Sequence, residues 1–183
     1  MKYLALDIGN VCIAIRPERL FAALGVSGPE ALPAELFGMV DLLERGRLSE
    51  EAFSARFREL TGDGRSGDEL RAAFVSIIGE PIPGMAEKLE RLIDAGVQPV
   101  FFSDTSALHL AEVRRKFPAA RRIPDGVYSF EVGAKKPEPA MFRAFEERFG
   151  TPAAYWDDRP ELIAAAPPEW NARLFRSAED AVL

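Results

Sequence analysis

The chain has 183 residues, of which 48% are apolar and 28% charged, as in a globular protein with one domain or a core domain carrying a small insertion. Its net charge of −6 argues against nucleic acid as the main partner, and no apolar run reaches the roughly 20 residues of a membrane span. A single cysteine, Cys12, and a single histidine, His109, exclude an intramolecular disulfide and a histidine-based zinc cluster. Asp7 interrupts the apolar start of the chain, which is unlike a signal peptide, so we expect a cytoplasmic protein.

Four short apolar runs predict buried strands, at residues 3–8, 97–103, 153–158 and 172–177. Between the first two runs, residues 16–83 have helical patterns throughout, and no strand is expected there. Ser49 is expected to be the N-cap of one of these helices. The length of this helical stretch favours an insertion over a long crossover.

Two further helices are predicted over residues 83–96 and 137–150, and each ends at a glycine. Strands that alternate with helices indicate a parallel, doubly wound α/β sheet of the Rossmann-like kind. We therefore expect a core formed by residues 1–15 and 84–183, with a small helical cap at 16–83 inserted after the first strand.

Polar side chains follow three of the predicted strands, at the point where each strand ends. They are Asp7 after the first, Ser103, Asp104 and Thr105 after the second, and Asp157 and Asp158 after the third. In open parallel sheets, ligands bind beyond the carboxyl ends of the strands, so these groups are expected to converge. Carboxylates that lie close together repel one another, and a divalent cation removes the conflict. Oxygen ligands without histidine or thiolate favour Mg²⁺.

A basic loop and an acidic fourth segment complete a set of four motifs. Lys135 and Lys136 precede the helix at 137–150 and supply positive charge near the predicted cation. The four segments are LALDIGNV (4–11), FFSDT (101–105), GAKKPEPAMF (133–142) and YWDDRPELIAAA (155–166). In this order, they resemble the motifs of the haloacid dehalogenase-like superfamily of hydrolases. The likeness is nearest to bacterial phosphatases whose first motif reads DLGNV, which include sugar-phosphate phosphatases, and residues 16–83 resemble the helical cap of one branch.

The resemblance implies a role for each motif residue. Asp7 would attack phosphorus and form an aspartyl-phosphate, while Lys136 would neutralise the charge on both groups. The phosphoryl oxygens would be held by Ser103 and by the backbone N–H groups of Ile8, Gly9 and Asp104. A Mg²⁺ ion would be held by Asp7, the carbonyl of Gly9 and Asp158, with Asp157 as a further ligand or as support for the others.

Gly9 is a departure from most phosphatases of this superfamily, which have an aspartate two residues after the nucleophile. That aspartate protonates the leaving oxygen, and general acid–base help of this kind contributes about 10²–10⁴ in rate. Its absence would favour leaving groups that need little protonation. Alternatively, Gly9 serves the backbone, through a positive φ or a close approach to the ligand.

The resemblance therefore implies a Mg²⁺-dependent phosphatase, a hydrolase that acts on a small phosphorylated metabolite, with sugar phosphates as candidates. Neither nucleic acid, a membrane nor an obligate protein partner is expected. One alternative is a dehalogenase of the same superfamily, in which the aspartate attacks carbon. Another is an inactive relative that binds phosphorylated ligands without turnover, an alternative that Gly9 and Asp104 leave open.

Overall fold

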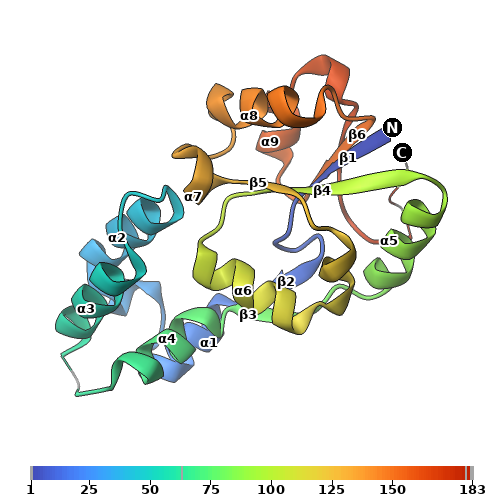
Figure 1. The fold of residues 1–183 in the computed structure, drawn as a ribbon. Coiled ribbons are helices and arrows are strands. Elements are labelled where there is room, and N and C mark those ends of the chain that lie inside the picture. Colours follow the sequence, from blue (N-terminus) through green and yellow to red (C-terminus); the bar gives the residue numbers. More distant parts are fainter. Residues whose placement is uncertain (1, 63, 180, 182–183) are drawn as a thin grey trace.

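A five-stranded sheet with the strand order β5-β4-β1-β6-β7 forms the centre of the molecule (Figure 1). The structure is a computed structural model that describes residues 2–62, 64–179 and 181, so the ends of the expected core, at 1 and 182–183, lie outside the described residues. The strands are β1 (Lys2–Leu6), β4 (Val97–Ser103), β5 (Gly126–Tyr128), β6 (Ala154–Asp157) and β7 (Ala172–Leu174). All pairings within this sheet are parallel, which confirms the predicted α/β fold.

Helices cover both faces of the sheet, and β1 shows how its residues divide between the two faces. Leu4 and Leu6 are buried in one apolar cluster with residues of α5 (Met85–Asp94) and α6 (Ala107–Lys116). Ala5 instead belongs to a second cluster with residues of α8 (Pro139–Phe149). This alternation is what a strand buried on both faces requires. The predicted helices at 83–96 and 137–150 are thus α5 and α8. None of the helices in the described ranges is long and apolar enough to cross a bilayer.

The segment expected to be a cap contains four helices that gather away from the sheet, coloured blue to green at the lower left of Figure 1. They are α1 (Pro17–Leu24), α2 (Ala34–Glu44), α3 (Glu50–Thr61) and α4 (Gly67–Val75). Phe53, Phe57 and Phe74 are buried at the centre of a separate apolar cluster. The Ser49 hydroxyl accepts a hydrogen bond from the Ala52 N–H at 3.2 Å, as its predicted N-cap role requires.

Two strands that join this segment to the core were not predicted. β2 (Ile13–Ile15) and β3 (Ile78–Pro81) form an antiparallel pair, so β3 lies within the stretch that was expected to be helical throughout. That expectation was wrong because β3 is short and contains Gly79 and Pro81, which are poor strand formers. The core strand β5 was missed for a similar reason, since it has three residues and begins with Gly126.

A second contact between the helical segment and the core lies at the C-terminal end of α2. Arg45 Nη1 donates to Glu138 Oε1 at 2.7 Å, and Arg47 Nη2 donates to the Gly133 carbonyl at 3.2 Å. Gly46 has φ +63°, and a Cβ there would lie 2.1 Å from the Phe130 carbonyl oxygen in α7 (Ser129–Val132). This close approach requires glycine, and it places the end of α2 beside the carboxyl ends of the strands.

The remaining elements of the described residues are α9 (Pro160–Ala165) and the 3₁₀ turns at Pro29–Ala31, Pro118–Arg122 and Pro168–Trp170.

Candidate active site

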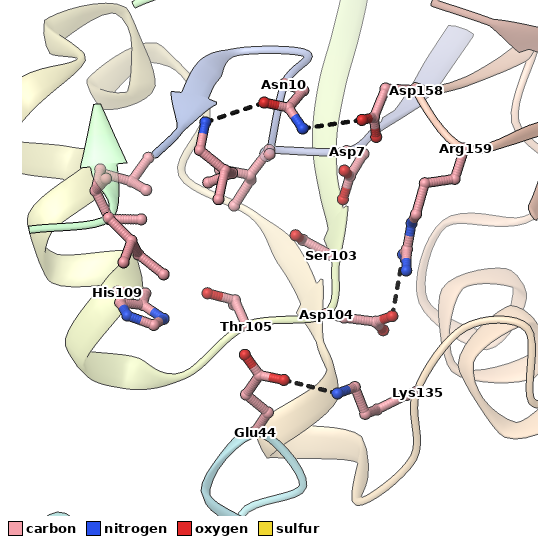
Figure 2. Close-up of a pocket in the computed structure, with 16 residues that line it drawn as sticks. Asp7, Asn10, Glu44, Ser103, Asp104, Thr105, His109, Lys135, Asp158 and Arg159 are labelled. Atoms are coloured by element: carbon pink, nitrogen blue, oxygen red, sulfur yellow. Dashed lines mark hydrogen bonds and ion pairs between the residues drawn. The ribbon is translucent and has the colours of Figure 1, made fainter. Parts of the chain in front are cut away.

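A pocket of about 300 Å³ opens at the carboxyl ends of β1, β4 and β6, between the sheet and the helical segment. Asp7, Ser103, Asp104 and Asp158, all expected to converge, line it together (Figure 2). They come from three neighbouring strands, because β1 lies between β4 and β6 in the sheet. The predicted convergence of polar groups at strand ends is therefore what the fold produces.

Lys136 lies beneath this pocket and joins two of the carboxylates. Its side chain is fully buried, and Nζ donates to Asp7 Oδ1 at 2.9 Å and to Asp157 Oδ2 at 2.6 Å. A third hydrogen bond, of 2.9 Å, goes to the Phe102 carbonyl. All three donor hydrogens are thus used, and the ammonium is fixed against the carboxylate of Asp7.

Asp157 uses both of its carboxylate oxygens within the protein. Oδ2 accepts from Lys136 and, at 2.5 Å, from the hydroxyl of Tyr155, while Oδ1 accepts from the Arg159 N–H at 2.9 Å. The ring of Tyr155 is buried in the core, and its hydroxyl adds this polar contact. This arrangement orients Lys136 toward Asp7.

The pKa values of the three groups follow from burial and from their mutual charges. Burial raises the pKa of Asp7 to about 6, against the opposing effect of Lys136. Burial alone would lower the pKa of Lys136, but the neighbouring carboxylates, Asp7 first, outweigh it and raise that pKa. Burial would likewise raise the pKa of Asp157, yet Lys136 and the surrounding hydrogen bonds lower it. At neutral pH the buried lysine is therefore charged and faces ionised carboxylates.

The acidic residues form a set with the chemistry of a hard cation site. One ligand atom from each of Asp7, Asp157 and Asp158 lies within 4.8 Å of the other two. Asp158 Oδ2 accepts a hydrogen bond of 3.0 Å from Asn10 Nδ2, which orients that carboxylate (Figure 2). The set contains oxygen atoms alone, which suits Mg²⁺. Asp157 already accepts three hydrogen bonds from protein donors, so Asp7 and Asp158 are the carboxylates with more acceptor capacity to offer a cation.

The residues expected to hold a phosphoryl group surround the same pocket. Ile8, Gly9, Ser103 and Asp104 all line it, and Ser103 is buried. The side chain of Asp104, however, is bonded within the protein. Its Oδ1 accepts a hydrogen bond from the backbone N–H of Lys136 at 2.8 Å, and its Oδ2 accepts one from Arg159 Nη2 at 3.1 Å. Among the expected phosphate contacts, Asp104 therefore has its backbone N–H to offer and not its carboxylate.

Gly9 has an ordinary φ, outside the left-handed region, so the suggestion that it needs a positive φ was wrong. The positive φ belongs to the next residue, Asn10, at 52°. A Cβ on Gly9 would lie 3.1 Å from Ile15 Cγ1 and 3.9 Å from Asp7 Oδ2. A side chain at position 9 would thus point toward the pocket beside Asp7, against the side chain of Ile15.

Several pocket residues were not expected from the sequence. Asn10, Glu44 and Arg159 line the pocket. Lys135, which was expected to supply positive charge near the cation, forms an ion pair with Glu44 at 2.6 Å. Arg159 directly follows the acidic pair, and Asn10 lies in the first motif, so both could have been suspected from their position. Glu44 carries no such signal, because it lies in a helix of the inserted segment, outside the four motifs.

No protein-family model matches the chain. Among solved structures, a HAD family enzyme from Bacteroides thetaiotaomicron is 23% identical with a TM-score of 0.84, and the match covers 98% of this chain and 96% of that one. The same enzyme in complex with magnesium and inorganic phosphate has a TM-score of 0.82 at the same identity and coverage. A predicted HAD-like family hydrolase from Porphyromonas gingivalis is 22% identical with a TM-score of 0.76, over 97% of this chain and 91% of that one. The resemblance to the haloacid dehalogenase-like superfamily is thereby confirmed at the level of the fold, and the chain has the HAD fold.

Proposed function

We propose that the protein is a Mg²⁺-dependent phosphatase that hydrolyses a small phosphorylated metabolite through an aspartyl-phosphate. The observation that carries this proposal is the buried Lys136, held between Asp7 and Asp157 directly beneath a pocket that Asp158 and Ser103 also line. A carboxylate fixed against an ammonium and open to a pocket is suited to attack an anionic centre, because the cation offsets the repulsion. The core at 1–15 and 84–183 would supply this chemistry, with residues 16–83 as the cap.

In the first step, the free carboxylate oxygen of Asp7 forms a bond to phosphorus as the bond from phosphorus to the leaving oxygen breaks. The leaving oxygen departs with the electron pair and takes a proton from solvent. Water then attacks phosphorus, the bond to Asp7 breaks, and inorganic phosphate is released with the carboxylate restored. The proton lost by that water balances the one taken by the leaving group, and Lys136 stabilises the negative charge throughout.

The residues present fit a Mg²⁺ ion. Asp7, Asp158 and the carbonyl of Gly9 would hold it, with Asp157 behind them as the residue that positions Lys136. When bound, Mg²⁺ neutralises charge on the phosphoryl oxygens and orients the group for in-line attack. The magnesium and phosphate found together in the B. thetaiotaomicron enzyme support this assignment.

The substrate is proposed to be a small ester, with sugar phosphates as the leading candidates. The pocket volume of about 300 Å³ is at the small end of the range for ligand sites. Gly9 supplies no acid to the leaving oxygen, which favours anomeric, acyl or aryl phosphates over simple alkyl esters.

The dehalogenase alternative is less well supported by the site. Attack on carbon needs no cation, whereas Asp7, Asp157 and Asp158 bring three carboxylates together at one edge of the sheet. An inactive phospho-ligand binder is disfavoured by the position of Asp7, which has one oxygen fixed by Lys136 and lines the pocket itself.

The proposal is tested by incubating the purified protein with a panel of phosphate esters and with 2-chloropropionate, each with Mg²⁺ and with EDTA. We expect phosphate release that needs Mg²⁺ and no chloride release. Chloride release without phosphate release would favour the dehalogenase, and phosphate release that EDTA does not diminish would remove the proposed metal role.

A further inference from the structure

Three side chains gather on the side of the pocket away from Asn10 and Asp158 (Figure 2). They are Glu44 at the end of α2, His109 in α6 and Lys135 in the loop before α8, and we call them the distal wall. In the described part of the chain, none of these three side chains forms a hydrogen bond or ion pair with the side chain of Asp7 or Lys136. The proposed phosphoryl-transfer mechanism therefore gives no role to the polar groups of the distal wall.

His109 is held by the helical segment in a single hydrogen-bonding form. Its Nε2 lies 3.2 Å from the carbonyl oxygen of Phe74, near the end of α4, and its ring stacks on the Phe74 ring with centroids 4.3 Å apart. A carbonyl oxygen can accept but cannot donate, so Nε2 carries the proton. In the neutral ring, Nδ1 is then an acceptor.

Neutrality of that ring is favoured by its surroundings. His109 is 4% exposed, and burial lowers its pKa, with the Phe74 carbonyl and the charge of Glu44 opposing the shift. No hydrogen bond to Nδ1 occurs within residues 2–62, 64–179 and 181, while the residue lines the pocket. The pocket therefore presents a neutral acceptor that suits a hydroxyl group.

Glu44 and Lys135 supply complementary groups next to this acceptor. Lys135 Nζ donates to Glu44 Oε2 at 2.6 Å, and their side chains are 23% and 18% exposed respectively. Glu44 offers further acceptor capacity through its second oxygen. Lys135 Nζ also donates to Asp41 Oδ1 at 3.4 Å, so one of its three hydrogens is left to donate. Together these residues can accept from and donate to neighbouring hydroxyls, the pattern that a polyol presents.

We propose that the distal wall of Glu44, His109 and Lys135 binds the hydroxyl groups of the leaving group, so that the enzyme selects phosphorylated sugars and related polyols. This inference rests on the proposed phosphatase function. It assigns the selection to one residue of the helical segment and two of the core, with α4 fixing the acceptor form of His109. The pocket is also lined by Ile15, Ile77 and Ile78, which offer an apolar surface to the carbon skeleton.

The experiment compares kcat/KM in Mg²⁺ for hydroxyl-bearing esters (glucose 1-phosphate, ribose 5-phosphate and glycerol 3-phosphate) with kcat/KM for phenyl phosphate. The ratio of the best hydroxyl-bearing ester to phenyl phosphate is the readout, because a general loss of activity cancels in it. Glu44→Gln should lower this ratio about tenfold, since hydrogen bonds to charged groups are the stronger ones. Glu35→Gln is the matched control, because Glu35 lies on the same helix but is exposed outside the pocket.

Two substitutions of His109 separate its contact with Phe74 from its contact with substrate. The amide of His109→Gln reaches the place of Nε2 and keeps a donor for the Phe74 carbonyl, whereas that of His109→Asn reaches the place of Nδ1 and keeps the acceptor. We expect His109→Gln to lower the substrate ratio about fivefold with little change in Tm. Compared with His109→Gln, His109→Asn should lower the Tm more and the substrate ratio less.

The outcomes of these measurements distinguish a failure of the distal-wall proposal from a failure of the phosphatase proposal. If the wild type hydrolyses phenyl phosphate but Glu44→Gln and both His109 variants keep the wild-type ratio, the distal wall does not select the substrate, and the phosphatase proposal stands. If His109→Asn loses the ratio and His109→Gln keeps it, the role of Nδ1 is overturned. If the wild type hydrolyses no ester in Mg²⁺, the proposed function fails and this inference fails with it.

Discussion

Two groups of residues at the pocket are built differently. One is the strand-end group, in which Asp7 lines the pocket and is bonded to the buried Lys136, which also binds Asp157. The other is the distal wall of Glu44, His109 and Lys135. The side chains of Lys136 and Asp157 are fully buried and that of Asp7 is 7% exposed, whereas Glu44 and Lys135 are 18% and 23% exposed. Charges fixed in a dry environment act strongly and need no rearrangement. The first group therefore suits the phosphoryl group that the proposed substrates share, and the second suits the part of the substrate that varies.

The largest expected effect comes from the strand-end group. Asp7→Asn should lower kcat/KM at least about 10³-fold on every phosphate ester, because the amide cannot attack phosphorus. The fold should persist, since Lys136 keeps its bonds to Asp157 and to the Phe102 carbonyl. Phosphate release and thermal unfolding provide the two measurements, with Asp94→Asn, an exposed position away from the pocket, as control. A variant that loses activity on sugar phosphates but keeps it on phenyl phosphate would break the division between the two regions.

The adjacent residues Asp157 and Asp158 are expected to have different roles near Asp7, one in stability and one in metal binding. Asp158→Asn should weaken Mg²⁺ binding about tenfold or more and leave the Tm of the metal-free protein nearly unchanged. Asp157→Asn should lower that Tm markedly, because it removes a charged partner from the buried ammonium of Lys136, a loss of about 3 kcal/mol. Titration of Mg²⁺ by calorimetry and thermal unfolding in EDTA distinguish these effects. Equal losses of Mg²⁺ affinity in both variants would show that Asp157 is itself a ligand.

Substitutions of Gly9 test whether the site lacks a proton donor for the leaving oxygen. If Gly9 marks an absent proton donor, Gly9→Asp should raise kcat/KM for alkyl phosphates relative to aryl phosphates by about tenfold. Gly9→Ala adds the same Cβ against Ile15 without the carboxyl group, so it measures the steric effect alone. Rates on a series of leaving groups are the measurement. A uniform loss in both variants would show that the glycine provides space for the ligand.

The smallest expected effect concerns the charge of the distal wall. Because burial lowers the pKa of His109, the unfolded chain takes up a proton as the pH falls through about 6.5, whereas the folded protein takes it up only at a lower pH. The contribution of His109 to stability is therefore present above that pH and is lost on acidification, by up to about 1.4 kcal/mol for each pH unit. The stability of the wild type relative to His109→Gln should fall between about pH 7.5 and about pH 5.5. A difference in unfolding free energy that is independent of pH would mean that the folded ring accepts the proton.

The two regions also differ in how far the sequence predicts them. Asp7, Ser103 and Asp158 each follow a strand, and the carboxyl ends of parallel strands meet at one edge, so their convergence follows from the fold class. The partner of Glu44 could not be predicted, because it depends on how α2 packs against the core at Gly46. The strands β3 and β5 were missed because they are too short to show a periodic pattern. The several roles of Asp157, Tyr155 and Asp104 as acceptors and donors within the protein also became evident from the geometry alone.

The charges around the pocket imply an order in which ligands bind. The strand ends carry four carboxylates, those of Asp7, Asp104, Asp157 and Asp158. Among the described residues, Lys136 and Arg159 are the cations that pair with them, so negative charge is in excess by two. A phosphate dianion that approaches this surface alone is repelled, whereas a divalent cation is attracted and brings the local charge to balance. The cation is thus expected to bind before the phosphorylated substrate, and free phosphate should leave before the cation does. In kinetic terms, the metal is a leading essential activator, and substrate affinity rises with its occupancy.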